Sequence, residues 1–182
     1  MDFQAYSHGQ IVSKLWLCET LEPYITVNSN ICILGCWYNL LGQMLLVRKK
    51  NHYNFITGID IDSVAIDIAN KINIGFMIER KMNNYVADAN IYDISGNNVV
   101  INTSPEHMDN DSWYNNIPQN TLVCLQTSNV DKNDDIWKIT NPIRSLDEFI
   151  KKYPLSNTLY SDTLHIKYDD WGYERYMLIG FK

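Results

Sequence analysis

The sequence lacks the features that mark several classes of protein. No apolar run approaches the ~20 residues that a membrane-spanning helix requires, and residues 1–8 have neither the basic start nor the apolar centre of a signal peptide. Lys and Arg number 15 against 21 Asp and Glu, which gives a net charge of −6. Nucleic-acid binders usually carry a basic surface, so the charge alone disfavours such a partner. We therefore expect a cytoplasmic protein with no membrane partner.

Motifs of common catalytic and metal sites are also missing. There is no Walker-type glycine-rich loop and no nucleophile elbow, and the acidic and histidine residues show no recognised metal-ligand spacing. We predict no bound metal. The cysteines form no CxxC pair and mostly lie in apolar stretches, so we expect buried, reduced thiols at Cys18, Cys32, Cys36 and Cys124.

The sequence does contain enough apolar material for one core. Its 182 residues are 46% apolar and 12% aromatic, and no linker or repeat divides them. We predict a single domain over 1–182, with an N-terminal helix over about 7–21 and a core sheet over about 31–182. Ser7 and Gln10 match a capping box at the start of that helix.

The pattern after this helix alternates between strand and helix. Residues 31–35 form a wholly apolar run that ends in glycine, as in a strand buried on both faces of a parallel sheet. Helical spacing follows over 40–47, then a strand over 55–60 and a helix that begins at Asp62 or Ser63. This order predicts right-handed crossovers onto one parallel sheet.

Later segments complete the predicted α/β fold. Ser145 caps a helix that runs to Lys152, and Asp and Gly within 168–172 favour a tight reversal between two strands. We predict a mostly parallel central sheet with a C-terminal antiparallel hairpin and helices on both faces. The remaining strands are expected at 84–88, 98–102, 121–126, 158–167 and 174–181.

Polar residues and a glycine stand at the ends of four predicted strands. In an open parallel sheet, ligands bind beyond the C-terminal strand ends. Gly35 permits close approach of a ligand, and Asp60, 25 residues later, has the spacing of an acid that accepts the ribose hydroxyls of an adenosine. Asp88 could accept from an adenine amino group, and Asn102 ends the fourth strand. Singly these residues also fit turns and helix caps; together they predict adenosine binding.

This arrangement resembles the Rossmann-like fold of class I S-adenosylmethionine-dependent methyltransferases, and more narrowly a group of compact phage and bacterial methyltransferase-like proteins. The family's acid-x-Gly-x-Gly-x-Gly turn is reduced here to 35–39, with bulky residues where the second and third glycines would stand. The Asn-Pro-Pro-aromatic loop of amino-group DNA methyltransferases is absent. The narrower resemblance is carried by segments within 7–17, 34–39, 58–62, 102–108, 125–126 and 175–180.

The resemblance implies S-adenosylmethionine as cofactor and assigns part of its site. It places Gly35 and Trp37 against the methionine moiety, Asp60 against the ribose and Asp88 near the adenine. It also places the acceptor at the loop 102–107 that follows the fourth strand.

Other candidates follow from the physical demands of methyl transfer. Lys14 could meet the methionine carboxylate with Gln10 beside it, because a helix just before the first strand can cover the cofactor; a solvated lysine is the alternative. Aromatic faces suit a sulfonium cation, so Trp37, Tyr38 and Trp113 are candidates, with core packing as their alternative.

Methyl transfer to an oxygen or nitrogen also requires a group that takes the acceptor's proton, and the pair Glu106 and His107 is our candidate for this task. Histidine is a common general base in enzymes, so His107 could take a proton from an oxygen or nitrogen acceptor, with Glu106 as neighbour or substrate anchor. Asn102 begins the same loop, and these three residues are our candidates for the catalytic group. A structural role for the histidine is the alternative.

These observations predict a methyltransferase that acts by direct displacement on a small molecule, a nucleotide or a flexible segment. No residues remain for a separate target-recognition domain. One alternative is a non-catalytic, phage-type binding protein that docks on a host partner. Another is different S-adenosylmethionine chemistry, such as aminocarboxypropyl transfer or cofactor cleavage.

Overall fold

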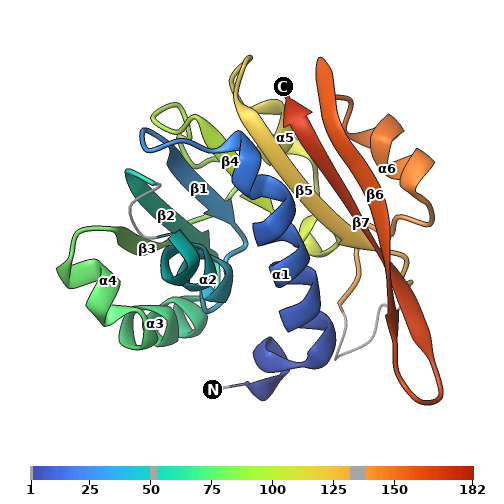
Figure 1. Cartoon of the computed structure of the whole chain (residues 1–182), viewed down its shortest axis with the longest axis horizontal. Coiled ribbons are helices and arrows are strands. Elements are labelled where there is room, and N and C mark those ends of the chain that lie inside the picture. The colour runs from blue at the N-terminus through green and yellow to red at the C-terminus, as the bar shows by residue number, and fades with distance from the viewer. Residues whose placement is uncertain (1, 50–52, 132–137) are drawn as a thin grey trace.

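The computed structural model describes residues 2–49, 53–131 and 138–182 and contains one seven-stranded sheet, in the order β3-β2-β1-β4-β5-β7-β6 (Figure 1). Strands β1 to β5 run parallel, and β7 is antiparallel to both β5 and β6. The predicted mixed sheet with a C-terminal hairpin is confirmed. The strands are β1 Asn30–Leu34, β2 Phe55–Asp60, β3 Met82–Val86, β4 Val99–Asn102, β5 Leu122–Ser128, β6 Asn157–Lys167 and β7 Gly172–Phe181.

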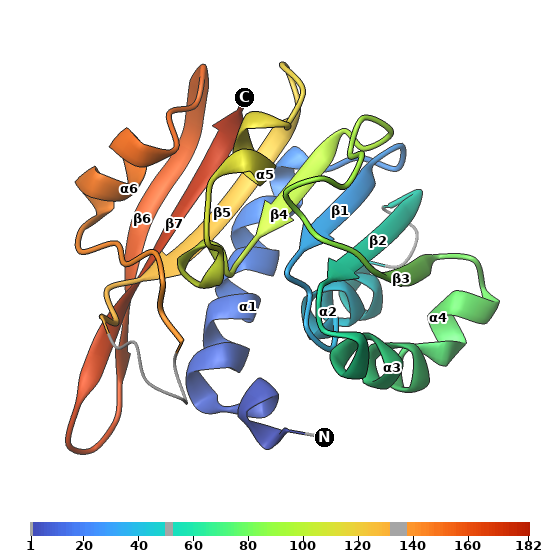
Figure 2. The ribbon, with the colours of Figure 1, turned by 180° about the vertical axis from the view of Figure 1, so that it is seen from behind.

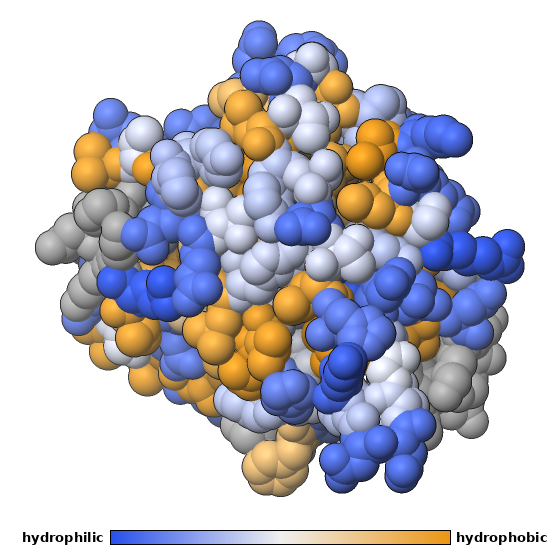
Figure 3. All heavy atoms as spheres, turned by 45° about the vertical axis from the view of Figure 1, so that its right-hand side comes forward, coloured by the Kyte–Doolittle hydropathy of each residue, from blue (hydrophilic) through white to orange (hydrophobic). Residues whose placement is uncertain are grey.

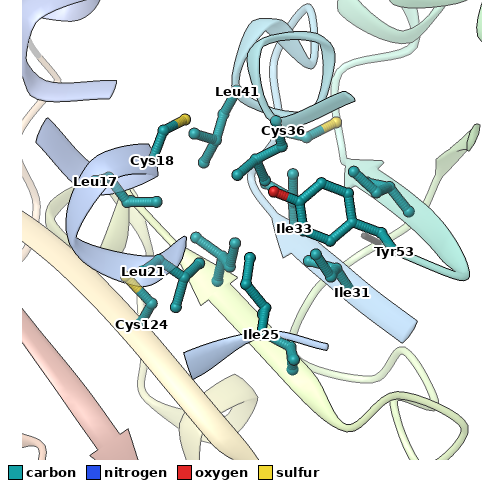
Figure 4. Packing of buried hydrophobic residues seen from close by; sticks show 14 of the residues in the cluster. Leu17, Cys18, Leu21, Ile25, Ile31, Ile33, Cys36, Leu41, Tyr53 and Cys124 are labelled. Atoms are coloured by element: carbon teal, nitrogen blue, oxygen red, sulfur yellow. The ribbon is translucent and has the colours of Figure 1, made fainter. Parts of the chain in front are cut away.

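Helices cover both faces of the sheet, as Figures 1 and 2 show from opposite sides. On one face, Leu17 and Leu21 of α1 pack with Leu41 of α2 against Ile31 and Ile33 of β1 (Figure 4). The helices are α1 His8–Leu21, α2 Leu40–Lys49, α3 Ser63–Ile72, α4 Ile74–Ile78, α5 Ser112–Asn115 and α6 Leu146–Lys152, with 3-10 turns η1 Phe3–Tyr6, η2 Glu22–Tyr24 and η4 Pro105–His107.

The opposite face has its own apolar cluster. Trp113 of α5 and Phe149 of α6 are fully buried there against the alternate side chains of β4 and β5, such as Val100 and Val123. Because successive strand residues point to opposite faces, these central strands must be apolar throughout. All residues of β4 and β5 are buried, in agreement with the predicted continuous apolar runs.

The two predicted helix caps have different outcomes. Ser145 accepts a hydrogen bond from the Glu148 amide at 3.1 Å, as predicted. Ser7 does precede α1, but its side chain makes no cap bond, so the predicted capping box is wrong. The reason lies in Gln10, whose side-chain oxygen accepts from Lys14 Nζ, one turn further along the helix, and so does not reach back to Ser7.

Burial accounts for the chemistry of the thiols. All four cysteines are free and buried, as expected. Desolvation raises the pKa of Cys18 and of Cys32 to about 12, so both thiols stay protonated at neutral pH.

Across residues 2–49, 53–131 and 138–182, no helix has both the length and the apolar character needed to cross a bilayer. Figure 3 shows hydrophilic and apolar side chains interspersed over the face turned toward the viewer.

Candidate functional site

The turn after β1 adopts a backbone shape that normally requires glycine. Its φ angles are 59° at Gly35, 51° at Trp37 and 49° at Asn39. These are the positions of the three glycines in the family turn to which the sequence was compared. A positive φ at a non-glycine residue costs of order 1–3 kcal/mol and persists where the surroundings fix it. The turn therefore has a left-handed backbone at all three positions, although only one of them is glycine.

Asn39 is the residue that fixes this turn, and the sequence reasoning missed it. Its side chain is fully buried, and its Oδ1 accepts from the Gly42 amide at 3.1 Å in the first turn of α2. Its Nδ2 donates to Asn84 Oδ1 on β3 at 2.6 Å. Asn tolerates the left-handed region better than most residues, and that preference was the available signal at this position.

Asp60 lies beside the turn, as the sequence spacing predicted. The Trp37 amide donates to its Oδ2 at 2.7 Å, and the Asp62 amide donates to its Oδ1 at 3.0 Å. The Cys36 amide also donates to the carbonyl of Ile59 at 2.9 Å, which joins the turn to the end of β2. An ionised carboxylate can accept about four hydrogen bonds, so two acceptor positions of the half-buried Asp60 remain for a ligand.

Asp88 lies at the same edge of the sheet, just beyond β3. The Ala87 amide donates to the Asp60 carbonyl at 2.9 Å, so the two acidic residues follow neighbouring strand ends. The strand ends at Val86, two residues earlier than predicted, because Asp88 Oδ1 accepts from the Asn90 amide at 2.9 Å and from its Nδ2 at 3.0 Å. This Asx turn leads the chain away from the sheet.

Three apolar side chains at this edge are exposed to solvent. Ile61, directly after Asp60, is 72% exposed, Val86 is 55% exposed and Ile91 is 82% exposed. The sequence reasoning did not select them. An isoleucine immediately after a strand-terminal acid was the signal that could have drawn attention to Ile61.

The predicted aromatic residues have unequal positions. The half-buried indole of Trp37 packs against the small cluster of Ala5, Tyr38 and Ala65. Trp113 is fully buried between the rings of Tyr114 and Tyr153, with centroids 5.7 and 5.3 Å away. For Trp113 the core-packing alternative is therefore correct, because no ligand can reach an indole enclosed by other rings.

The loop after β4 lies over Gly35. Ser104 Oγ donates to the Gly35 carbonyl at 3.4 Å, and the Met108 methyl lies 3.4 Å from where a Cβ of Gly35 would be. Asn102 is fully buried; its Oδ1 accepts from the Ser104 amide at 2.8 Å and its Nδ2 lies 3.3 Å from Met108 Sδ. Asn102 thus holds the loop in place over the turn.

Glu106 is part of a buried ion pair. Its Oε1 accepts from Arg175 Nη1 at 2.9 Å and its Oε2 accepts from Thr127 Oγ1 at 3.2 Å. Arg175 Nη2 donates to the Thr103 carbonyl at 2.6 Å. The ion pair joins β7 to the loop after β4, across 69 residues of sequence, and the sequence reasoning did not find Arg175.

His107 points away from Glu106 toward solvent. Its side chain is exposed, and its Nδ1 lies 3.2 Å from the carbonyl oxygen of Lys138. A carbonyl can only accept, so Nδ1 carries the proton and Nε2 is the basic nitrogen of the ring. The structure therefore does not bring Glu106 and His107 together as one acid–base pair.

Lys14 and Gln10 lie on α1, near Arg175 rather than near Asp60. Lys14 Nζ donates to Gln10 Oε1. Burial, and then the positive charge of Arg175, lower the pKa of Lys14 to about 7. The carbonyl of the preceding Ser13 accepts from Gln126 Nε2 on β5 at 3.0 Å, which places this part of α1 over β5.

Metal and thiol chemistry find little support at this site. Within the three described stretches of chain, no three His, Cys, Asp or Glu side chains are grouped so as to hold a metal ion. Burial, and then the carboxylate of Asp60, raise the pKa of Cys36 well above its usual value, so this thiol stays protonated beside the turn.

Comparison with known proteins identifies the fold. No protein-family model matches the sequence, and no curated protein is significantly similar to it. Solved structures do match: the N-methyltransferase NodS from Bradyrhizobium japonicum WM9 is 10% identical with a TM-score of 0.70, over 95% of this chain and 97% of that one. The geranyl diphosphate C-methyltransferase from Streptomyces coelicolor A3(2), solved with S-adenosyl-L-homocysteine, is 10% identical with a TM-score of 0.66, over 91% and 79%. The chain has the fold of the class I S-adenosylmethionine-dependent methyltransferases.

Proposed function

We propose that this protein is an S-adenosylmethionine-dependent methyltransferase. The observation that supports this most is the junction of the turn at 35–39 with Asp60. There, three positive φ angles and the bond from the Trp37 amide to Asp60 Oδ2 reproduce a glycine-rich ligand turn beside a strand-terminal acid. Structural neighbours of the same fold, such as the geranyl diphosphate enzyme, were solved with S-adenosyl-L-homocysteine.

The proposed cofactor site follows the ends of β1, β2 and β3. The two unused acceptor positions of Asp60 suit the two ribose hydroxyls. Asp88 accepts two hydrogen bonds from Asn90, and both go to Oδ1. Its Oδ2 is therefore the oxygen that would accept from an adenine amino group. The exposed Ile61 gives the adenine an apolar surface, and the Gly35 backbone lies where the methionine moiety would pass.

Bound S-adenosylmethionine supplies an activated methyl group that needs no metal for its transfer. The protein must then hold the acceptor in line and take its proton. We assign the proton to Nε2 of the exposed His107, since Nδ1 is held by the Lys138 carbonyl. Held by Gly35, Asp60 and Asp88, the cofactor would supply the methyl group by direct displacement, and its sulfur would keep the electron pair of the bond that is broken.

Glu106 and Asn102 are positioning residues in this proposal. Both carboxylate oxygens of Glu106 already accept from Arg175 and Thr127, and the residue is 2% exposed. Asn102 is bound to the Ser104 amide and to Met108. Their effect on catalysis would come from the shape of the loop that carries His107.

The acceptor we propose is a small molecule, a nucleotide or a flexible segment. The described elements belong to the sheet, its covering helices and their connections, and none of them forms a second lobe that could grip a duplex. The loop 103–108 is short and lies directly over Gly35, so the acceptor must fit beside it.

Calorimetric titration with S-adenosylhomocysteine tests this proposal. We expect micromolar binding to the wild type and about 30-fold weaker binding to Asp60→Asn, because charge-assisted bonds to the ribose are worth about 2 kcal/mol. Asp67→Asn is the matched control, since Asp67 is exposed on α3. Absence of binding to the wild type at millimolar ligand would refute the proposal and favour a non-catalytic docking protein.

A further inference from the structure

A buried arginine and a half-buried lysine, Arg175 and Lys14, lie near the loop 103–108 on strand β7 and helix α1. Arg175 is 7% exposed and Lys14 is half-buried beside it. Glu106 Oε1 lies 2.9 Å from Arg175 Nη1 and pairs with that cation, whereas Lys14 Nζ donates to the neutral amide oxygen of Gln10. Buried charges in proteins are normally paired, yet among the described residues no carboxylate lies within ion-pair distance of Lys14.

Arg175 also has an unused hydrogen-bonding edge. Its Nη1 donates to Glu106 and its Nη2 to the Thr103 carbonyl, whereas its Nε is buried and finds no acceptor in the described part of the chain. Guanidinium groups bind carboxylates and phosphates through two adjacent donors. Gln126 Oε1, on the neighbouring strand and the same face of the sheet, is likewise buried with no donor among the described residues.

The hairpin and α1 enclose this group. Tyr173 stands two residues before Arg175 on β7, and the Gly9 amide of α1 donates to Tyr168 Oη at 3.1 Å. A Cβ at Gly9 would collide with Tyr173 Oη and lie 2.8 Å from Tyr168 Oη, so any larger residue there would have to displace the two tyrosine hydroxyls. Figure 1 shows the end of this hairpin extending past the sheet toward the start of α1.

We propose that Arg175 and Lys14 bind an oxyanionic group, a carboxylate or phosphate, of the methyl acceptor, with Gln126 Oε1 accepting from a hydroxyl of the phosphate or from a hydroxyl beside the carboxylate. This inference rests on the proposed function. The methionine carboxylate of the cofactor is the other source of such an anion, and it was our sequence-based prediction for Lys14.

The position of Arg175 in the sheet favours the acceptor, rather than the cofactor, as the source of the bound anion. Arg175 is on β7, which is separated from β1 by β4 and β5, so its backbone lies about 14 Å from the strand that carries the cofactor turn. Its contacts are to Thr103 and Glu106, in the loop where the acceptor is expected. No contact joins Lys14 or Arg175 to Gly35 or Asp60 among the described residues.

The experiment uses inorganic phosphate as the probe, because it carries both an oxyanion and a hydroxyl. Thermal unfolding at pH 6.5 is compared in phosphate and in chloride at equal ionic strength. At a phosphate concentration ten times its dissociation constant, we expect the wild type to gain about 3–5 °C. Lys14→Met should lose most of this gain and Lys14→Arg should keep it. Lys151→Met, at an exposed position on α6, is the control and should respond like the wild type.

Two further arms identify the source of the anion. If the acceptor assignment is correct, saturating S-adenosylhomocysteine leaves the phosphate effect in place. If S-adenosylhomocysteine removes the effect and 5′-methylthioadenosine, which lacks the carboxylate, does not, the site belongs to the cofactor and the assignment is overturned. An equal phosphate response in the wild type and Lys14→Met would remove the oxyanion site altogether. Failure of S-adenosylhomocysteine to bind any of these proteins contradicts only the proposed function.

Discussion

The edge of the sheet formed by β1, β2 and β3 differs from the adjoining edge of β4, β5 and β7 in what holds its polar groups. At the first edge, backbone amides of the turn 35–39 and of residue 62 point at Asp60. At the second, side chains far apart in sequence meet in a buried ion pair between Glu106 and Arg175. The first edge is a generic frame built by local backbone geometry. The second depends on side-chain contacts between segments far apart in sequence.

This difference explains how much of the site could be predicted from the sequence. The strand at 55–60 and its terminal Asp60 were identified because an apolar run followed by an acid is a local pattern. The helix predicted to begin at Asp62 or Ser63 is α3, and the Asp62 side chain accepts from the amides of Val64 and Ala65 at its start. Arg175 was missed because nothing in the local sequence links a residue of β7 to a loop 69 residues earlier.

The predictions that were wrong also concern contacts between side chains that a local motif does not encode. The capping box at Ser7 failed because Gln10 is engaged by Lys14, a contact that the local motif does not encode. Trp113 was a candidate for a sulfonium contact, but its burial depends on the packing of α5 against α6, which no single segment specifies. Local sequence patterns predicted most of the helices and strands. The roles of individual side chains depend on contacts between elements, which those patterns do not encode.

The largest effect is expected from a substitution that breaks the ion pair between Arg175 and Glu106 at the second edge. Arg175→Met should lower the free energy of unfolding by about 3–5 kcal/mol, because it leaves the Glu106 carboxylate buried without its counter-ion. Adding Glu106→Gln to this variant should recover at least half of the loss. Urea denaturation followed by circular dichroism measures both changes. A loss below about 1 kcal/mol for Arg175→Met would show that the pair is solvated.

A smaller effect is expected at the first edge, in the turn. Asn39→Ala should cost about 2–3 kcal/mol, because it removes two buried hydrogen bonds and keeps a positive φ. Asn39→Gly loses the same bonds without the backbone strain, so it should be more stable than Asn39→Ala by about 1 kcal/mol. Equal stabilities of the two variants, measured by urea denaturation, would contradict the strained turn.

The pH dependence of stability sharpens the comparison, because a lysine with a lowered pKa lies at the second edge. The pKa of Lys14 is about 7 in the folded protein, against 10.5 for the unfolded reference. Between these values the unfolded chain binds the extra proton, so Lys14 lowers stability as pH falls from 10.5 to 7, and the full penalty is present below 7. Arg175 opposes its protonation and Cys18, whose thiol stays neutral, favours it only weakly.

Lys14→Met should therefore be more stable than the wild type at pH 6, by about 1 kcal/mol once solvent screening of a half-buried group is allowed for. The difference should shrink toward zero as the pH approaches 10.5. Paired urea denaturations at pH 6 and pH 9.5 give the result. A difference that grows with pH would have the wrong sign for this explanation.

The smallest effects are expected at the two predicted helix caps, Ser145 and Ser7. Ser145→Ala should cost about 1 kcal/mol, since the hydroxyl accepts from the Glu148 amide. Ser7→Ala should cost clearly less, because the Ser7 side chain makes no cap bond. Thermal denaturation of the two single variants makes the comparison, and equal losses would mean that Ser7 caps α1 after all.

The most direct test of the account is a map of ligand binding onto the two edges by amide NMR. The amides of Trp37 and Asp62 donate to the Asp60 carboxylate, so they report on any ligand that shares it. On addition of S-adenosylhomocysteine we predict the largest shift changes at residues 35–37, 60–62 and 87–89, with small changes along β6. Saturable binding whose shift changes were confined to the β6–β7 hairpin would contradict the adenosyl site at Gly35 and Asp60.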